Sequence, residues 1–211
     1  MHHLIGHEHA LLRLGRLLDV PVDMHLHDYA AFCPRVTLLN PARQYCGEPA
    51  DPAVCDACVA DGGRAAGDDL PVAALRARSA ADLASARSVV VPSADAASRV
   101  RRHFPAVRAL VRRLEDDLAF PPPSPMRVRP VRRVCVIGGI GPEKGYDVLL
   151  ACARDAVARR LGLEFILVGH TPDDGRLLDT GRVFVTGPYM EADAAALVRA
   201  QDADIGWLPS I

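Results

Sequence analysis

Hydrophobic residues recur along this chain in two patterns, as short runs rich in Val and Ile and as longer stretches with apolar residues three or four positions apart. The first pattern predicts buried strands and the second predicts amphipathic helices. In the second half of the chain the two alternate regularly, which predicts an α/β unit with a parallel sheet covered on both faces. The predicted strands are 131–137, 164–168, 182–186 and 205–208, and the predicted helices are 146–161 and 191–200.

The first half of the chain carries weaker signals. Only two clear strands are predicted, which is too few for a doubly wound sheet, so we expect this unit to be incomplete. A serine precedes the last helix and is expected to cap it. The predicted elements are a helix over 10–18, a strand over 20–26, a helix over 71–87, a strand over 88–91 and a helix from Ser93 to His103.

Five prolines stand among the twelve residues 119–130. Proline-rich segments are stiff and extended, so this stretch is expected to link two separate units. The sequence therefore predicts a first domain over 1–118 and a second over 131–211.

Composition adds few constraints on function. The chain has 211 residues, is 50% hydrophobic and carries a net charge of −1, so no overall charge steers it towards nucleic acid. Arg127, Arg129, Arg132 and Arg133 form a local basic run, which is either solvated surface or a contact for anionic lipid. No apolar run approaches the ~20 residues of a membrane helix, and no secretory signal is evident. We expect a cytoplasmic protein, with peripheral contact at the inner membrane face as an option.

The single lysine is the most distinctive position of the chain. Of 25 basic residues 24 are arginine, and Lys144 stands in a glycine-rich loop, Gly138 to Gly145, directly after a predicted strand. Lysine presents a compact charge on a flexible stem, which suits a diphosphate oxygen, and glycines let a ligand approach the backbone. The alternative is that arginine richness reflects coding bias and that Lys144 is an ordinary surface residue. Further loops at predicted strand ends contain Gly169, Pro209 and Ser210, where ligands bind in open parallel sheets.

Four cysteines form a second candidate site. Cys33, Cys46, Cys55 and Cys58 have the spacing C-x12-C-x8-C-x2-C within a predicted loop over 33–67. The closing C-x-x-C is a spacing at which two thiolates share one Zn2+, and a structural metal would order a loop that has little apolar content. Free thiols and disulfides are the alternatives.

Three stretches of the sequence resemble the nucleotide-sugar-binding domain of retaining, family-4-like GT-B glycosyltransferases. They are the run from Val134 to Leu150, the strand from Phe165 to Gly169, and Trp207 to Ser210. In the first half, His27-Asp28-Tyr29 followed by Cys33-Pro34-Arg35 and Cys55-Asp56-Ala57-Cys58 is similar to the acceptor-side domain of polysaccharide-type members. The resemblance implies a GT-B fold, in which two Rossmann-like doubly wound units face each other across a cleft.

The resemblance also implies an activity and site residues. A hexose would pass from a nucleoside-diphosphate sugar to a polysaccharide or lipid-linked acceptor, with retention at the anomeric carbon. Lys144 would contact the diphosphate together with Gly138, Gly139, Gly145, Gly169, Pro209 and Ser210, and His27 would face the reaction centre.

Two departures from the family pattern leave alternatives open. Gly139-Ile140-Gly141 stands where an arginine is usual, and the paired glutamates of the family are absent before the sequence stops at Ile211. We therefore expect a segment of a larger transferase. A non-catalytic truncated remnant and a zinc-stabilised binding module are the alternatives, which a turnover assay and a metal analysis distinguish.

Overall fold

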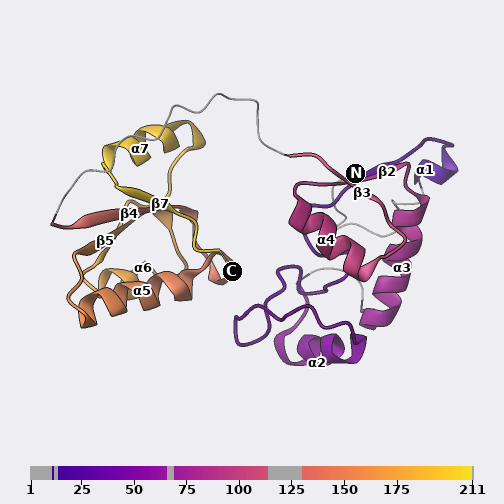
Figure 1. Cartoon of the computed structure of the whole chain (residues 1–211), viewed down its shortest axis with the longest axis horizontal. Helices are drawn as coiled ribbons and strands as arrows, with labels where there is room; N and C mark the ends of the chain where they lie inside the picture. Colours follow the sequence, from indigo (N-terminus) through magenta and orange to yellow (C-terminus); the bar gives the residue numbers. More distant parts are fainter. Residues whose placement is uncertain (1–10, 12–13, 66–68, 114–129, 211) are drawn as a thin grey trace. The chain divides into compact units, whose positions relative to one another are not determined.

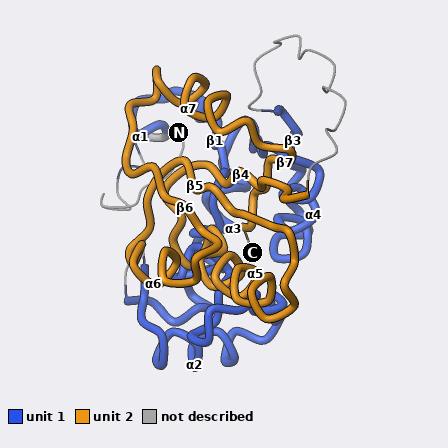
Figure 2. Tube along the Cα trace, turned by 90° about the vertical axis from the view of Figure 1, so that its left-hand side faces the viewer, with its two compact units in different colours: residues 1–120 blue, residues 121–211 orange. Residues whose placement is uncertain are grey.

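The computed structural model describes residues 11, 14–65, 69–113 and 130–210. The chain divides into two compact units, Met1–Phe120 and Pro121–Ile211, coloured separately in Figure 2. The predicted linker over 119–130 lies outside the described residues apart from Pro130. Each unit is an α/β structure with its own parallel sheet, which confirms the predicted fold class.

Unit 1 contains a three-stranded parallel sheet in the order β1-β2-β3. The prediction of two strands was therefore wrong. The third strand was missed because it is short and leaves Leu110 and Val111 exposed, so it lacks the buried apolar run that marks a strand in sequence. The strands are β1 (Asp23–His25), β2 (Ser88–Val91) and β3 (Ala109–Val111).

An ion pair fixes the start of β1 against β2. Arg87 donates to Asp23 through Nε at 2.9 Å and through a second nitrogen, and Ser88 Oγ donates to the same carboxylate at 2.7 Å. These hydrogen bonds, from Arg87 first and Ser88 second, hold the pKa of Asp23 well below its usual range. The parallel register that follows pairs Met24 with Val89.

The described residues of unit 1 form the helices α1 to α4 (Figure 1). Ser93 caps α4 as predicted, because its Oγ accepts the Ala96 amide at 3.1 Å. Val89 and Val91 of β2 pack with Leu83 of α3 and Val100 of α4 in one buried apolar cluster. The helices are α1 (Leu14–Leu17), α2 (Pro52–Gly62), α3 (Val72–Ser85) and α4 (Ala94–His103).

The expectation of a loop throughout 33–67 was wrong over α2. Asp51 accepts the Ala53 amide at 2.9 Å, and Pro52 occupies the first turn, so the local start signals are strong. The hydrophobic pattern failed to show this helix because none of its residues is buried.

Unit 2 has a four-stranded parallel sheet in the order β6-β5-β4-β7. In Figure 1, α7 lies on one face of this sheet and α5 and α6 lie on the other, so the predicted three-layer unit is confirmed. The short helix α6 was not predicted. The strands are β4 (Arg132–Gly139), β5 (Leu163–His170), β6 (Val183–Val185) and β7 (Ile205–Trp207). The helices are α5 (Tyr146–Ala158), α6 (Asp174–Leu178) and α7 (Ala194–Ala200), with 3-10 turns at Pro142–Lys144 and Glu191–Asp193.

The core of unit 2 lies between the sheet and α5. Val136, Leu149, Ala153 and Leu167 are fully buried and belong to one apolar cluster. Fully burying one such Leu or Val side chain contributes roughly 1.5–3 kcal/mol. This packing makes the ends of β4 and β5 a rigid platform for the loops that follow them.

Candidate functional site

The strand order of unit 2 creates a switch point beside β4. The chain runs from β4 to β5 and β6 on one side, and then crosses back to place β7 on the other side of β4. The loop after β4 and the segment after β7 therefore both follow the carboxyl ends of neighbouring strands, beside the point where the strand order reverses, and open parallel sheets bind ligands at such points. The loop after β4 carries Lys144, and the segment after β7 carries Pro209 and Ser210.

Two glycines close the adjacent strand ends. Gly138 on β4 pairs with Gly169 on β5, where φ is 143°. A Cβ at Gly169 would lie 2.0 Å from the Gly138 carbonyl oxygen, so the strands approach closely only because this side chain is missing. One residue further on, His170 lies beside Gly139, and its carbonyl accepts the Ile140 amide at 2.9 Å.

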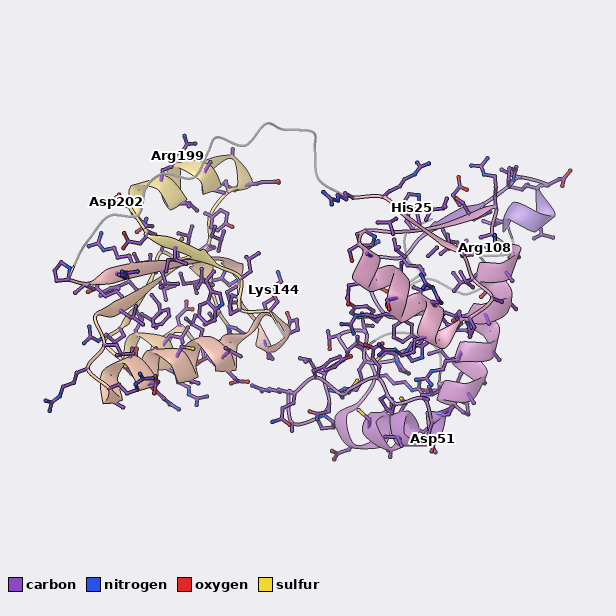
Figure 3. The ribbon with its side chains drawn as sticks, in the orientation of Figure 1. His25, Asp51, Arg108, Lys144, Arg199 and Asp202 are labelled. Atoms are coloured by element: carbon purple, nitrogen blue, oxygen red, sulfur yellow. The ribbon has the colours of Figure 1, made fainter. Side chains whose placement is uncertain are left out.

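Gly145 packs the loop after β4 against the segment after β7. Its φ is 85°, and a Cβ there would lie 2.0 Å from the Pro209 carbonyl oxygen. The structure thus brings Gly145, next to Lys144 in the chain, against Pro209, and a single site formed by these residues with Ser210 stays a prediction. Figure 3 shows Lys144 at the end of the unit where α5 begins, and its side chain is exposed.

Tyr146 anchors the first turn of α5. Its ring is 5% exposed, and its hydroxyl donates to the Asp173 carbonyl at 2.9 Å. Burial raises the pKa of Tyr146, so the hydroxyl stays a donor at neutral pH. The amino-terminal end of a 13-residue helix, with its positive dipole, is thereby fixed next to Lys144.

His170 and Thr186 were missed as site residues by sequence reasoning. Thr186 Oγ1 accepts the Gly169 amide at 3.1 Å and so connects the loop after β6 to the end of β5. Their position was the available signal, because His170 is the last residue of β5 and Thr186 directly follows β6.

His27 belongs to the other unit. It is exposed and lies two residues beyond β1, at the carboxyl end of that sheet. Asp28 Oδ1 accepts the Ala30 amide at 2.9 Å, and this local turn ends the extended segment. Both His27 and Lys144 therefore lie at carboxyl ends of parallel strands, and a shared reaction centre between them stays a prediction.

The four loop cysteines are half-buried free thiols. Burial is the main cause that raises the pKa of Cys33, Cys55 and Cys58. Within the described ranges, no group of three or more His, Cys, Asp or Glu side chains stands in an arrangement that holds a metal ion. The side-chain positions alone therefore do not support the predicted zinc site.

A buried carboxylate that sequence reasoning missed joins this cysteine segment to α4. Glu48 has a fully buried side chain and forms ion pairs with Arg99 and, at 3.5 Å, with Arg102. His103 Nε2 lies 3.4 Å from Glu48 Oε2, yet both atoms are buried without a hydrogen-bond partner. Burial, and then the charge of Arg76, lower the pKa of His103 against the opposing effect of Glu48.

An open depression of about 550 Å³ lies along α7 in unit 2. It is lined by Pro188, Tyr189, Met190, Asp193, Ala196, Leu197 and Ala200. None of the predicted site residues lines it, so the candidate site rests on strand topology and not on this hollow.

The structure describes only two of the four arginines of the basic run for which a contact with anionic lipid was predicted. Arg127 and Arg129 lie outside the described residues, whereas Arg132 and Arg133 are exposed at the start of β4. Across the described parts of the chain, no helix has the length and apolar character needed to cross a bilayer.

Comparison with protein-family models gives no match for this chain, and comparison with curated proteins gives none either. Among solved structures, the chain is similar to a mutant of TarM from S. aureus in complex with fondaparinux, alpha-GlcNAc-glycerol and UDP. The TM-score is 0.49 and the sequence identity is 12% over 84% of this chain. The chain spans 31% of the TarM chain.

Proposed function

We propose that this chain is part of a retaining glycosyltransferase, in which unit 2 binds the nucleoside diphosphate of a sugar donor. The observation that carries the proposal is the switch point beside β4, where Lys144 and the start of α5 meet the segment after β7. The carboxyl ends of strands beside such a reversal of strand order are where open parallel sheets bind ligands. A lysine and a helix amino terminus together favour a phosphate over a neutral ligand.

The chemistry proposed for unit 2 is stabilisation of the departing diphosphate. Lys144 would donate to a diphosphate oxygen, and backbone amides of the first turn of α5 would face the same group. Charge grows on the diphosphate as its bond to the sugar breaks, so fixed donors lower the barrier most at that stage. No atom lies within 4 Å of the Cβ position of Gly138, so the backbone there is open to this contact, whereas Gly145 and Gly169 make room for the carbonyls of Pro209 and Gly138.

The acceptor side of the proposal rests on unit 1. His27 would face the anomeric carbon, and the acceptor would be a growing polysaccharide or a lipid-linked saccharide. A hexose as the sugar, retention at the anomeric carbon, and action at the inner membrane face follow from the family resemblance alone. A donor site without the usual arginine leaves Lys144 as the main cationic contact of the loop.

Calorimetric titration of the chain with UDP, GDP and ADP tests the donor site. One nucleotide is expected to bind, and Lys144→Ala should weaken it roughly 10–150-fold, since a hydrogen bond to a charged group contributes ~1.5–3 kcal/mol. Arg199→Ala is the matched control. It also removes one exposed positive charge from unit 2, on α7 away from Lys144 in Figure 3, and should leave the affinity unchanged.

Equal affinity in the wild type and in Lys144→Ala would refute the phosphate role. Equal losses in both variants would show a general charge effect instead of a contact. Turnover of a panel of nucleotide sugars then separates a transferase from a protein that binds the nucleotide without reacting it.

A further inference from the structure

The carboxyl edge formed by β4 and β5 carries a single side chain at its last two residue pairs. Gly138 of β4 pairs with Gly169 of β5, and the next pair is Gly139 with His170. Because the other three residues are glycines, only His170 can contact a ligand at this edge through a side chain. His170 is exposed, and it is the only histidine in the sequence of unit 2.

The imidazole of His170 lies over the bare backbone of Gly139. A Cβ at Gly139 would lie 3.6 Å from His170 Cε1 and 3.7 Å from His170 Nε2, and no other atom outside the neighbouring residues comes within 4 Å. The Cβ position of Gly138 has no atom within 4 Å at all. The nitrogen at the tip of the ring therefore lies beside the part of the edge where the backbone is open to a ligand.

A backbone hydrogen bond joins His170 to the loop that carries Lys144. The Ile140 amide donates to the His170 carbonyl at 2.9 Å, directly after β4 ends. The start of this loop is thus fixed to the residue that bears the imidazole. Movement of the loop relative to the His170 backbone would break this hydrogen bond.

The imidazole is available to a ligand. Among the residues that the structure describes, the His170 ring takes part in no hydrogen bond, ion pair or ring contact. The two acids of the following turn serve the start of α6. Asp174 Oδ1 accepts the Thr171 amide at 2.7 Å, and Asp173 Oδ1 accepts the Arg176 amide at 3.2 Å.

We propose that His170 is a second binding residue for the donor diphosphate, with Nε2 donating to a phosphate oxygen while Lys144 contacts the same group. A neutral imidazole carries its proton on one ring nitrogen, and a protonated imidazole donates through both. A hydrogen bond to an anionic phosphate is of the strong, charge-assisted kind. Gly139-Ile140-Gly141 stands where the family resemblance leads us to expect an arginine, and His170 supplies a donor over Gly139 from the neighbouring strand. This inference rests on the proposed function of unit 2.

Calorimetric titration of the full chain with UDP, GDP and ADP is the first test. The nucleotide that binds the wild type should bind His170→Ala roughly 10–150-fold more weakly, because a hydrogen bond to a charged group is lost. Arg182→Ala is the control, since it removes a donor side chain directly before β6, at the opposite end of the sheet, and should keep the wild-type affinity. Unchanged affinity in His170→Ala together with a loss in Lys144→Ala overturns this inference and leaves the proposed function standing. A wild type that binds none of the three nucleotides overturns both.

Nitrogen NMR of the histidine-labelled chain observes the ring directly in the wild type. The ring-nitrogen signals of His170 are those that disappear in His170→Gln. They should shift on saturation with the nucleotide and also with inorganic pyrophosphate, because the proposed contact is to the phosphates. Signals that respond to neither ligand, or to the nucleotide and not to pyrophosphate, overturn the inference, since the ring would then not contact the diphosphate.

Discussion

Replacing Gly145 by alanine should destabilise unit 2 more than any neutral substitution in its loops. Two costs add at this position. An L-residue at a φ of 85° costs roughly 1–2 kcal/mol, and the new methyl would lie 2.0 Å from the Pro209 carbonyl oxygen. Backbone atoms must shift to relieve that clash, which costs a further ~1–3 kcal/mol. The sum is about 3 kcal/mol, within a range of roughly 2–5 kcal/mol.

Two other glycines of unit 2 separate these costs. Gly181 has a φ of 63° and no atom within 4 Å of its Cβ position, so Gly181→Ala carries only the backbone cost. Gly206 has neither a positive φ nor a neighbour within 4 Å, and Gly206→Ala on β7 should be neutral or stabilising by roughly 0.5–1 kcal/mol. The same Gly→Ala change is therefore expected to lower the free energy of unfolding most at Gly145, less at Gly181 and not at all at Gly206.

Scanning calorimetry of the three variants measures the series. For a unit of this size, a loss of about 3 kcal/mol lowers the Tm of its transition by roughly 12–24 °C. Gly145→Ala should also weaken nucleotide binding, because the shift moves Lys144. The reasoning fails if Gly145→Ala is no less stable than Gly181→Ala, since the end of β7 would then not lie against this loop.

Three further predictions concern unit 1. Glu48→Gln should lower the free energy of unfolding by about 1–3 kcal/mol in a denaturant titration, because it deprives Arg99 of a buried partner, whereas the exposed control Glu191→Gln should not. The free energy of unfolding should fall as the pH drops below 6.5, the ordinary pKa of histidine, because the lowered pKa keeps His103 neutral in the folded chain while the unfolded chain takes up a proton. This fall should level off below the pKa of His103 in the folded chain. It should be absent from the variant His103→Gln. His27→Ala should leave nucleotide affinity and unfolding unchanged but reduce turnover, and a loss of nucleotide affinity would contradict its assignment to the acceptor side.

The elements that the sequence predicted well are those whose buried face is a simple run or period. Strand β2 has the predicted bounds because Val89, Val90 and Val91 are all buried. In unit 2 the same signal marks β4 and β5, and the glycines near the ends of these strands mark the candidate site. A candidate site at strand ends is predictable because the composition of the loops and the parallel topology both indicate the carboxyl ends of the strands.

What the sequence did not predict depends on contacts between distant residues. Helix α2 has no buried face, so its apolar residues show no helical periodicity in the sequence. Strand β3 is defined only by its pairing with β2. Glu48 reads as an ordinary loop acid until Arg99 and His103 of α4 enclose it. A charged side chain is buried only where it has such partners, and the sequence around Glu48 does not predict which distant residues they are.

The position of the proposed donor site likewise depends on contacts between distant parts of unit 2. Gly145 meets Pro209 after β7, Tyr146 meets Asp173 before α6, and Gly169 meets Thr186 after β6. Each contact joins the loop region to a later part of the chain, so the proposed site requires the whole sheet of unit 2 to be assembled. A phosphate contact must be held to within about 0.5 Å to be effective. Substitutions that loosen the ends of β6 or β7 should therefore reduce nucleotide affinity before they unfold the unit, and the exposed Lys144 is the residue whose position depends most on them.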